Sequence, residues 1–262
     1  MKIVATVKLV PDPNSEKRID PQTKRLDRSG AETVLNPYDE YAVEAALQLK
    51  EKLGDGTTVT VFSMAPERHK EILRKALAMG ADDAVVLSDP ALAGSDVWST
   101  AAAIAAGLKK IGFDLVVCGG LSDDGSTGGT PGALAEHLGV PGLTNARHLE
   151  CDGQRLTAQR ETDSGYQVVA TALPALVSVT MAVGEPRYAS LKGIMGAKKK
   201  TLATLCLADL GSDVPAGDDG ALTELVRVGP PATREKAAVV NATDGASGAR
   251  AIFDFLKQRK LV

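Results

Sequence analysis

The chain has 262 residues, which is enough for one sizeable α/β domain with an appendage or for two small domains. Its 30 Lys and Arg residues against 33 Asp and Glu residues give a formal charge of −3, and only 3% of the residues are aromatic. These values exclude a uniformly basic or aromatic-rich nucleic-acid-binding protein, although they leave room for a local basic patch. No apolar run approaches the roughly 18 residues of a membrane span, so we expect no membrane insertion.

Three widely spaced cysteines, Cys118, Cys151 and Cys206, form neither a metal-ligand cluster nor a disulfide framework. We therefore expect no metal site and a reducing, cytoplasmic location. Strand-like residues begin at Ile3, so we also expect no signal peptide.

Short apolar runs alternate with helical patterns in the first half of the chain. Four runs suit strands buried on both faces of a parallel sheet, at residues 3–7, 57–62, 84–87 and 115–118. Three helices are expected between them. The first begins at Asn36–Pro37 and ends at Gly54, the second begins at Pro66 and ends at Gly80, and the third begins at Ser95 and ends at Gly112. Residues 11–35 interrupt this order as either a surface excursion or a functional loop. The order predicts an α/β fold with a doubly wound, mostly parallel, Rossmann-like sheet.

The pattern changes after Pro141. We expect a hairpin whose arms are residues 149–160 and 165–171, and then a strand at 173–179. A Lys- and Gly-rich loop is expected at 184–200. An acidic, Gly-rich stretch at 211–223 is a linker candidate, and the tail 236–262 predicts a short amphipathic helix around Phe255. We therefore expect a main domain over residues 1–210, then a linker and C-terminal arm over 211–262.

A glycine-rich loop follows the strand at 115–118. Its glycines let the backbone approach a ligand closely, and the helix that begins near Ala133 favours an anion, above all a phosphate. The loop is neither GxGxxG nor a P-loop and contains no lysine, which argues against an enzyme that hydrolyses nucleoside triphosphates. His69, His137 and His148 fit no catalytic spacing. The alternative interpretation is a long flexible turn.

The most distinctive stretch is residues 185–200. From Arg187 to Lys200 there are five positive charges and no negative one, so the rest of the chain carries −8. Apolar side chains are interleaved with these charges, at Tyr188, Leu191, Ile194 and Met195. Apolar anchors inside a cationic rim suit a transient docking surface for an acidic partner. The alternative is a solvated loop whose apolar groups fold inward.

This stretch resembles the β subunits of electron transfer flavoproteins, including the nitrogen-fixation branch. The shared signature begins with a Leu-Pro-Ala strand, here at 173–175, and continues with Glu-Pro-Arg-Tyr at 185–188. It ends with an Ile-Met pair at 194–195 and a Lys-rich end at 198–200. Supporting matches lie at 36–40 and 76–82, and the glycine-rich loop aligns as well. The resemblance covers residues 1 to 210.

The resemblance implies an electron carrier rather than an enzyme, with no catalytic residue. The chain would form a heterodimer with an α subunit that holds most of an FAD, and 211–262 would pack on that α subunit. Acyl-CoA or other flavin dehydrogenases would be partners, as would an acceptor of the electron transfer flavoprotein–quinone oxidoreductase type, in a bacterial cytoplasm. The partner recognition loop would place Leu191 in a pocket of a dehydrogenase. Its residues would be Arg187, Tyr188, Leu191, Ile194, Met195, Lys198, Lys199 and Lys200.

The resemblance also implies that residues 1–210 bind a structural AMP. The implied contacts are Thr6, Asn36, Pro37, Tyr38, Asp39, Met64, Asp124, Gly125, Ser126, Thr127, Gly128, Gly129 and Thr130. Thr6 and Met64 depart from the common Ala and Cys, which suggests contacts mainly through the backbone. Asp124–Thr127 also resembles the loop of electron-bifurcating relatives, which bind a second FAD here, but residues 128–132 differ from theirs and favour AMP. A stand-alone nucleotide-binding, stress-type protein is a further alternative.

Overall fold

The structure is a computed structural model that describes residues 1–28, 30, 32–211, 213–229 and 239–262. Contacts divide the chain into two units, Met1–Leu225 and Val226–Val262, which are described separately. Residues 213–225 thus group with the first unit. The expected tail starts at 236, and its residues 236–238 lie outside the described residues. In the described part of the chain, no helix is long and apolar enough to cross a membrane.

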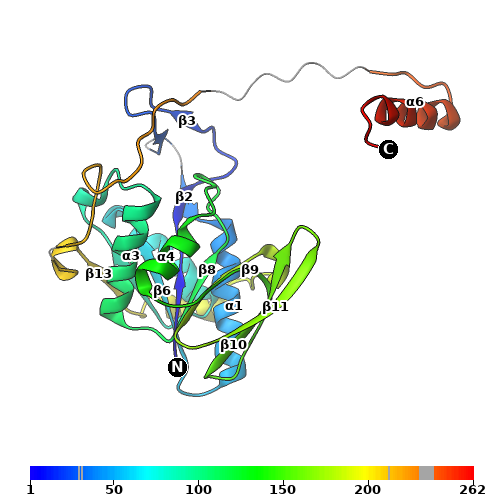
Figure 1. The fold of residues 1–262 in the computed structure, drawn as a ribbon. Helices are drawn as coiled ribbons and strands as arrows, with labels where there is room; N and C mark the ends of the chain where they lie inside the picture. Colours follow the sequence, from blue (N-terminus) through cyan, green and yellow to red (C-terminus); the bar gives the residue numbers. More distant parts are fainter. Residues whose placement is uncertain (29, 31, 212, 230–238) are drawn as a thin grey trace. The chain divides into compact units, whose positions relative to one another are not determined.

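The first unit is built on one large sheet (Figure 1), in which nine of the described strands follow the order β11-β10-β9-β12-β8-β1-β6-β7-β13. The parallel strands are β1 (Lys2–Thr6), β6 (Thr58–Met64), β7 (Asp83–Leu87), β8 (Leu115–Gly119), β12 (Ala175–Val179) and β13 (Leu202–Leu205). Beyond β12 the sheet continues with β9 (Gly142–Cys151), which also runs parallel to β12, and then with β10 (Arg155–Thr162) and β11 (Gly165–Ala172), which are added antiparallel. The Rossmann-like, mostly parallel architecture expected from the sequence is confirmed.

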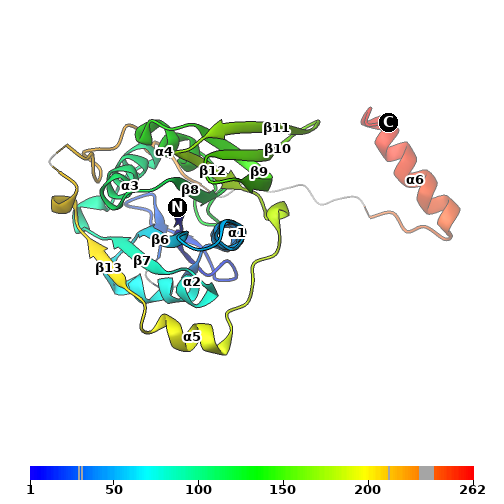
Figure 2. The ribbon, with the colours of Figure 1, turned by 90° about the horizontal axis from the view of Figure 1, so that it is seen from below.

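Helices cover both faces of the sheet, and each face has its own apolar core (Figure 2). On one face pack α1 (Pro37–Leu53) and α2 (Arg74–Met79), and on the other α3 (Val97–Ile111) and α4 (Thr130–Leu138). The β-branched runs of β1, β8 and β12 are buried because both of their faces meet helices. The stops expected at Gly54, Gly80 and Gly112 are confirmed as helix ends with positive φ.

Four sequence predictions about elements were wrong in detail. Asp96, not Ser95, caps α3, because its carboxylate accepts the Ser99 N–H at 2.9 Å. The helix expected at 66–80 begins as a 3₁₀ turn, η1 (Glu67–Leu73), before α2. The arm expected at 149–160 is broken by a turn at 152–154, where the Asp152 carboxylate accepts two backbone N–H bonds. The loop expected at 184–200 contains a helix, α5 (Leu191–Ala197).

The excursion at 11–35 contains short antiparallel pairs, β2 (Leu9–Pro11) with β5 (Thr33–Leu35) and β3 (Arg18–Ile19) with β4 (Leu26–Asp27). Single 3₁₀ turns complete the first unit, η2 (Pro90–Leu92), η3 (Met181–Val183) and η4 (Leu207–Asp209). The second unit contains α6 (Gly245–Gln258), whose N-terminus is capped reciprocally by Asp244 and Ser247. Its apolar side chains Ile252, Phe253 and Phe255 are exposed.

Candidate functional site

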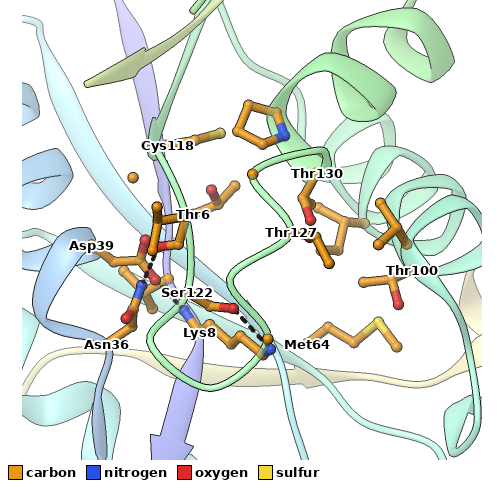
Figure 3. Close-up of a pocket in the computed structure, with 18 of the residues that line it drawn as sticks. Thr6, Lys8, Asn36, Asp39, Met64, Thr100, Cys118, Ser122, Thr127 and Thr130 are labelled. Atoms are coloured by element: carbon orange, nitrogen blue, oxygen red, sulfur yellow. Dashed lines mark hydrogen bonds between the residues drawn. The ribbon is translucent and has the colours of Figure 1, made fainter. Parts of the chain in front are cut away.

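A cavity of about 430 Å³ opens where the carboxyl ends of β1, β6 and β8 meet (Figure 3). The chain runs from β1 outward to β6 and β7, then returns to place β8 on the other side of β1. Ligands of open α/β sheets bind at such a reversal, in the crevice beyond the carboxyl ends of the strands. The volume lies within the roughly 300–1,000 Å³ range of small-molecule sites.

Most of the residues expected to hold a nucleotide line this cavity. Those lining it are Thr6, Asn36, Asp39, Met64, Gly125, Thr127, Gly128 and Thr130. The other five do not line it, namely Pro37, Tyr38, Asp124, Ser126 and Gly129. Strand ends, the first turn of α1 and the glycine-rich loop therefore converge on one cavity, although they are far apart in sequence.

The cavity is also lined by two cationic residues that no sequence pattern predicted as part of the site. Lys8 follows β1 and lines the cavity together with Arg28 from the excursion. The glycine-rich loop has no lysine of its own, but the fold brings Lys8 to it, with Nζ 3.2 Å from the Ser122 hydroxyl. The position of Lys8 just beyond the end of a buried strand was a usable signal. No feature of the excursion singled out Arg28.

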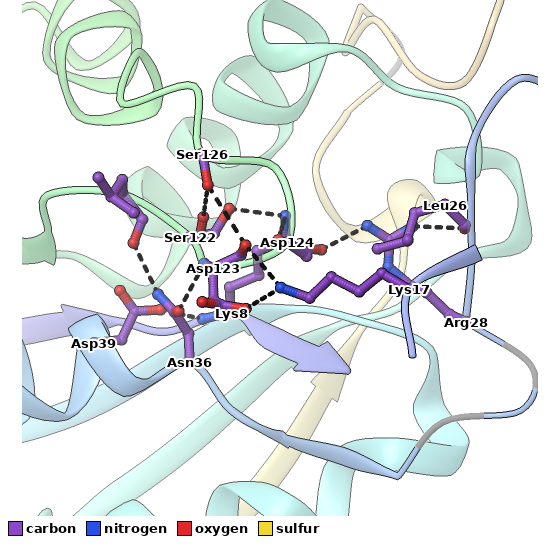
Figure 4. Close-up of polar contacts among 11 residues, drawn as sticks. Lys8, Lys17, Leu26, Arg28, Asn36, Asp39, Ser122, Asp123, Asp124 and Ser126 are labelled. Atoms are coloured by element: carbon purple, nitrogen blue, oxygen red, sulfur yellow. Dashed lines mark hydrogen bonds and ion pairs between the residues drawn. The ribbon is translucent and has the colours of Figure 1, made fainter. Parts of the chain in front are cut away.

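Asp124 organises these cations (Figure 4). Its carboxylate has no exposed surface and pairs with Lys8 Nζ at 2.7 Å and with Arg28 Nη2 at 2.6 Å. Burial of the carboxyl opposes its ionisation, but the hydrogen bonds from Lys8 and Arg28 outweigh burial and lower its pKa to about 2. Lys17 similarly pairs with Asp123 at 2.5 Å. The excursion is thus fastened to the glycine-rich loop by ion pairs.

Asn36 fastens the same loop to α1. Asn36 is the N-cap residue of α1 and Pro37 follows it in the first turn, as expected, but the Asn36 side chain makes no cap bond to the helix. Instead, Nδ2 donates to the Leu121 carbonyl at 2.9 Å, and Oδ1 accepts the Asp123 N–H at 3.1 Å. Asn36 is fully buried, so both of these bonds are shielded from water.

Asp39 is a further residue of the cavity lining. Its Oδ2 accepts the Lys8 N–H at 2.7 Å, and burial raises its pKa to about 7 against the opposing effect of that bond. A Cβ on Gly119 would lie 2.2 Å from Asp39 Oδ1 and 3.0 Å from the Tyr38 carbonyl oxygen. Position 119 therefore requires glycine, because β8 ends directly against the first turn of α1.

The start of α3 also forms part of the cavity wall. While one Asp96 carboxylate oxygen caps α3, the other accepts the Leu222 N–H, the Thr223 N–H and the Thr223 hydroxyl, each at 2.9 Å. Burial of the Asp96 carboxyl opposes its ionisation, but these bonds and those from Ser99 outweigh burial and lower its pKa to about 2. The Ser95 hydroxyl accepts the Gly217 N–H at 2.9 Å. The end of the first unit is thereby attached to the wall of the cavity.

The chemistry of the lining fits a mononucleotide. Hydroxyls of Thr127 and Thr130, the start of α4 and the two cations suit a phosphate. The lining also includes apolar groups of Met64, Ile104 and Cys118, which suit the faces of a base.

The second candidate site is the docking segment, defined here as residues 185–200. The apolar side chains of this segment are exposed, at 99% for Tyr188, 82% for Leu191, 72% for Met195 and 47% for Ile194. The alternative in which these groups fold inward is therefore wrong.

The five cations of the docking segment have different surroundings. Arg187 pairs with Glu44 at 2.7 Å and also with Glu51 on α1. Lys200 Nζ donates to the carbonyls of Leu77 at 2.9 Å and Ala81 at 2.6 Å. Among the described residues, the exposed Lys192, Lys198 and Lys199 make no ion pair. Two of the five cations hold the fold together, and three face solvent.

Comparison with known proteins identifies related chains. Residues 23–210 match the model of the electron transfer flavoprotein domain. The chain is 42% identical to electron transfer flavoprotein subunit beta of Mycobacterium tuberculosis over 99% of both chains, and 42% identical to that of Mycobacterium leprae over the same share. It is also 34% identical, over the whole of both chains, to the caffeyl-CoA reductase–Etf complex subunit CarD of Acetobacterium woodii.

Proposed function

Because this chain belongs to the electron transfer flavoprotein family, among its β subunits, we propose that it pairs with an α subunit, forms part of the FAD environment and holds AMP in the cavity beside β1 and β8. FAD supplies the redox chemistry by taking up and releasing electrons. The part of this chain is to hold the nucleotide, the α subunit and the redox partners in place.

The observation that carries the AMP proposal is the lining of the cavity. Lys8 and Arg28 bring positive charge to a loop rich in glycine and hydroxyl groups, while Met64 and Ile104 add apolar surface. A phosphate there would lie close to the start of α4, and an adenine would cover the apolar wall. AMP bound in this way would join the excursion, the glycine-rich loop and α3, which is a structural role.

A second FAD in the same cavity is the alternative. It is motivated by the relative named as a subunit of a caffeyl-CoA reductase–Etf complex. Residues 128–132 of this chain, Gly-Gly-Thr-Pro-Gly, support AMP as the first choice because they depart from the loop of the electron-bifurcating relatives.

We propose that the docking segment recognises acyl-CoA or other flavin dehydrogenases and an acceptor of the quinone oxidoreductase type. Leu191 is exposed among Lys192, Lys198 and Lys199, which supports a small interface. The lysines would attract an acidic surface of the partner. The exposed apolar side chains of α6 support its packing on the α subunit.

The test is to co-express the chain with its α subunit and to extract the nucleotides from the purified complex. We expect a yellow 1:1 heterodimer that releases one FAD and one AMP. Two FAD molecules and no AMP would support the alternative ligand. A colourless protein that ignores the α subunit would overturn the proposed function.

A further inference from the structure

The helix that carries the docking surface is too short to be stable by itself. α5 spans seven residues, from Leu191 to Ala197, and isolated helices shorter than about 12 residues are marginal in water. Only Ala197 of these residues is buried, at 2% exposure. The direction in which Leu191 and Met195 point must therefore be set by contacts between α5 and the rest of the first unit.

Those contacts come from α2, which lies beside α5 (Figure 2). Arg74 Nη1 donates to the Ala197 carbonyl, the last in α5, at 2.8 Å. In the opposite direction, Lys200 Nζ donates to the Leu77 and Ala81 carbonyls at the end of α2. Arg74 of α2 thus places a cation at the C-terminal end of α5, and Lys200, which follows α5, places one at the C-terminal end of α2, where cations are favourable.

Gly193 lies directly against the backbone of α2. A Cβ built on Gly193 would lie 2.3 Å from the Ala78 carbonyl oxygen and 3.4 Å from the Ala78 carbonyl carbon. The obstacle is backbone, so no side-chain rotation relieves it. α2 in turn is fixed by Ala76 and Leu77, which are fully buried against the sheet.

Gly196 provides the contrast on the same helix. It lies three residues further along α5, and a Cβ added there would meet nothing within 4 Å. Alanine at 196 therefore only raises helix propensity, whereas alanine at 193 forces α5 away from α2.

We propose that Gly193 is a positioning residue of the docking segment, whose missing side chain lets α5 lie directly on the backbone of α2 and so presents Leu191 and Met195 in a preformed orientation to a redox partner. This inference rests on the proposed docking function. Leu191 supplies the contact with the partner, and Gly193 acts only through α5.

The test uses the purified heterodimer and the acyl-CoA dehydrogenase of the source organism that reduces the wild-type complex. Gly193→Ala should raise the KM for that dehydrogenase on the order of tenfold, the scale of losing one anchor side chain, with kcat and FAD content unchanged. Its α5 amides should exchange with solvent faster than in wild type. Gly196→Ala should match wild type in KM and exchange as slowly or more slowly.

Leu191→Ala separates this inference from the proposed function. If Leu191→Ala leaves the KM unchanged, the proposed docking function of this segment is wrong. The amide exchange rates then test only whether Gly193 holds α5 against α2. If Leu191→Ala raises the KM and Gly193→Ala does not, the positioning role is overturned. Should Gly193→Ala give no folded heterodimer, Arg74→Gln takes its place, and an unchanged KM in that variant would likewise overturn the inference.

Discussion

Replacement of Lys8 by glutamine tests whether the fold supplies the phosphate-binding cation that the glycine-rich loop lacks. Lys8 Nζ lies 2.7 Å from Asp124 Oδ1 and 3.2 Å from the Ser122 hydroxyl, at the lining of the cavity. Glutamine keeps much of the length and polarity of lysine but removes the charge. We therefore expect Lys8→Gln to weaken AMP binding without collapsing the loop, which Asn36 and Arg28 still hold.

The magnitude follows from the surroundings of Lys8. A hydrogen bond to a charged group contributes roughly 1.5–3 kcal/mol. The Lys8 side chain is 43% exposed and is shared with Asp124, so the lower end of that range applies. Since about 1.4 kcal/mol corresponds to a tenfold change in affinity, we expect the Kd for AMP to rise about tenfold.

The assay is calorimetric titration of AMP into the nucleotide-free heterodimer. Lys17→Gln is the matched control, because Lys17 pairs with Asp123 of the same loop but does not line the cavity. Lys17→Gln should bind AMP as wild type does. Equal affinities of the Lys8 variant and wild type, or equal losses in both variants, would refute the reasoning.

Three further outcomes are expected. Leu191→Ala should raise the KM for a partner dehydrogenase about tenfold while FAD and AMP contents stay unchanged, and joint loss of both cofactors would instead indicate core packing. For Asp39, the pKa of about 7 lies above the ordinary 3.8, so the folded state loses stability as pH rises between these values, by on the order of 4 kcal/mol. Denaturant unfolding of Asp39→Asn from pH 4 to pH 8 should lack this decline, and a variant curve parallel to wild type would contradict it. Asp96→Asn keeps one oxygen that can accept the Ser99 N–H at the start of α3. Its NH2 group is a donor, so it cannot accept the hydrogen bonds from the Leu222 and Thr223 N–H groups. Amide exchange at Leu222 and Thr223 should accelerate while α3 stays protected, and unchanged exchange at these two residues would show that Asp96 does not hold them to α3.

Much of the scaffold was predictable because local signals and tertiary structure agree. Apolar runs gave the buried strands, and glycines such as Gly54 and Gly112 marked helix ends. The position of the cavity followed from the rule that the carboxyl ends of parallel strands meet at one edge. Thr6, which only the family resemblance had implied as a contact, lines the same cavity as the glycine-rich loop.

The errors arose where a distant partner decides a local choice. Asn36 has the residue type and position of a helix cap, yet its amide is bonded to a loop some 85 residues away. Ser95 and Asp96 are both good caps, and only the arrival of the chain at Gly217 and Thr223 distinguishes their roles. Arg28 joined the cavity through its pairing with Asp124, which no local pattern encodes.

A count of charges along residues 187–200 overstates what an approaching protein meets. Arg187 and Lys200 point inward to α1 and α2, so an encounter is governed by Lys192, Lys198 and Lys199. The ionic-strength dependence of association should accordingly reflect fewer than five charges, because Arg187 is paired with the carboxylates of Glu44 and Glu51. Neutralising Arg187 or Lys200 should therefore change the conformation of the docking segment more than it changes the association rate constant.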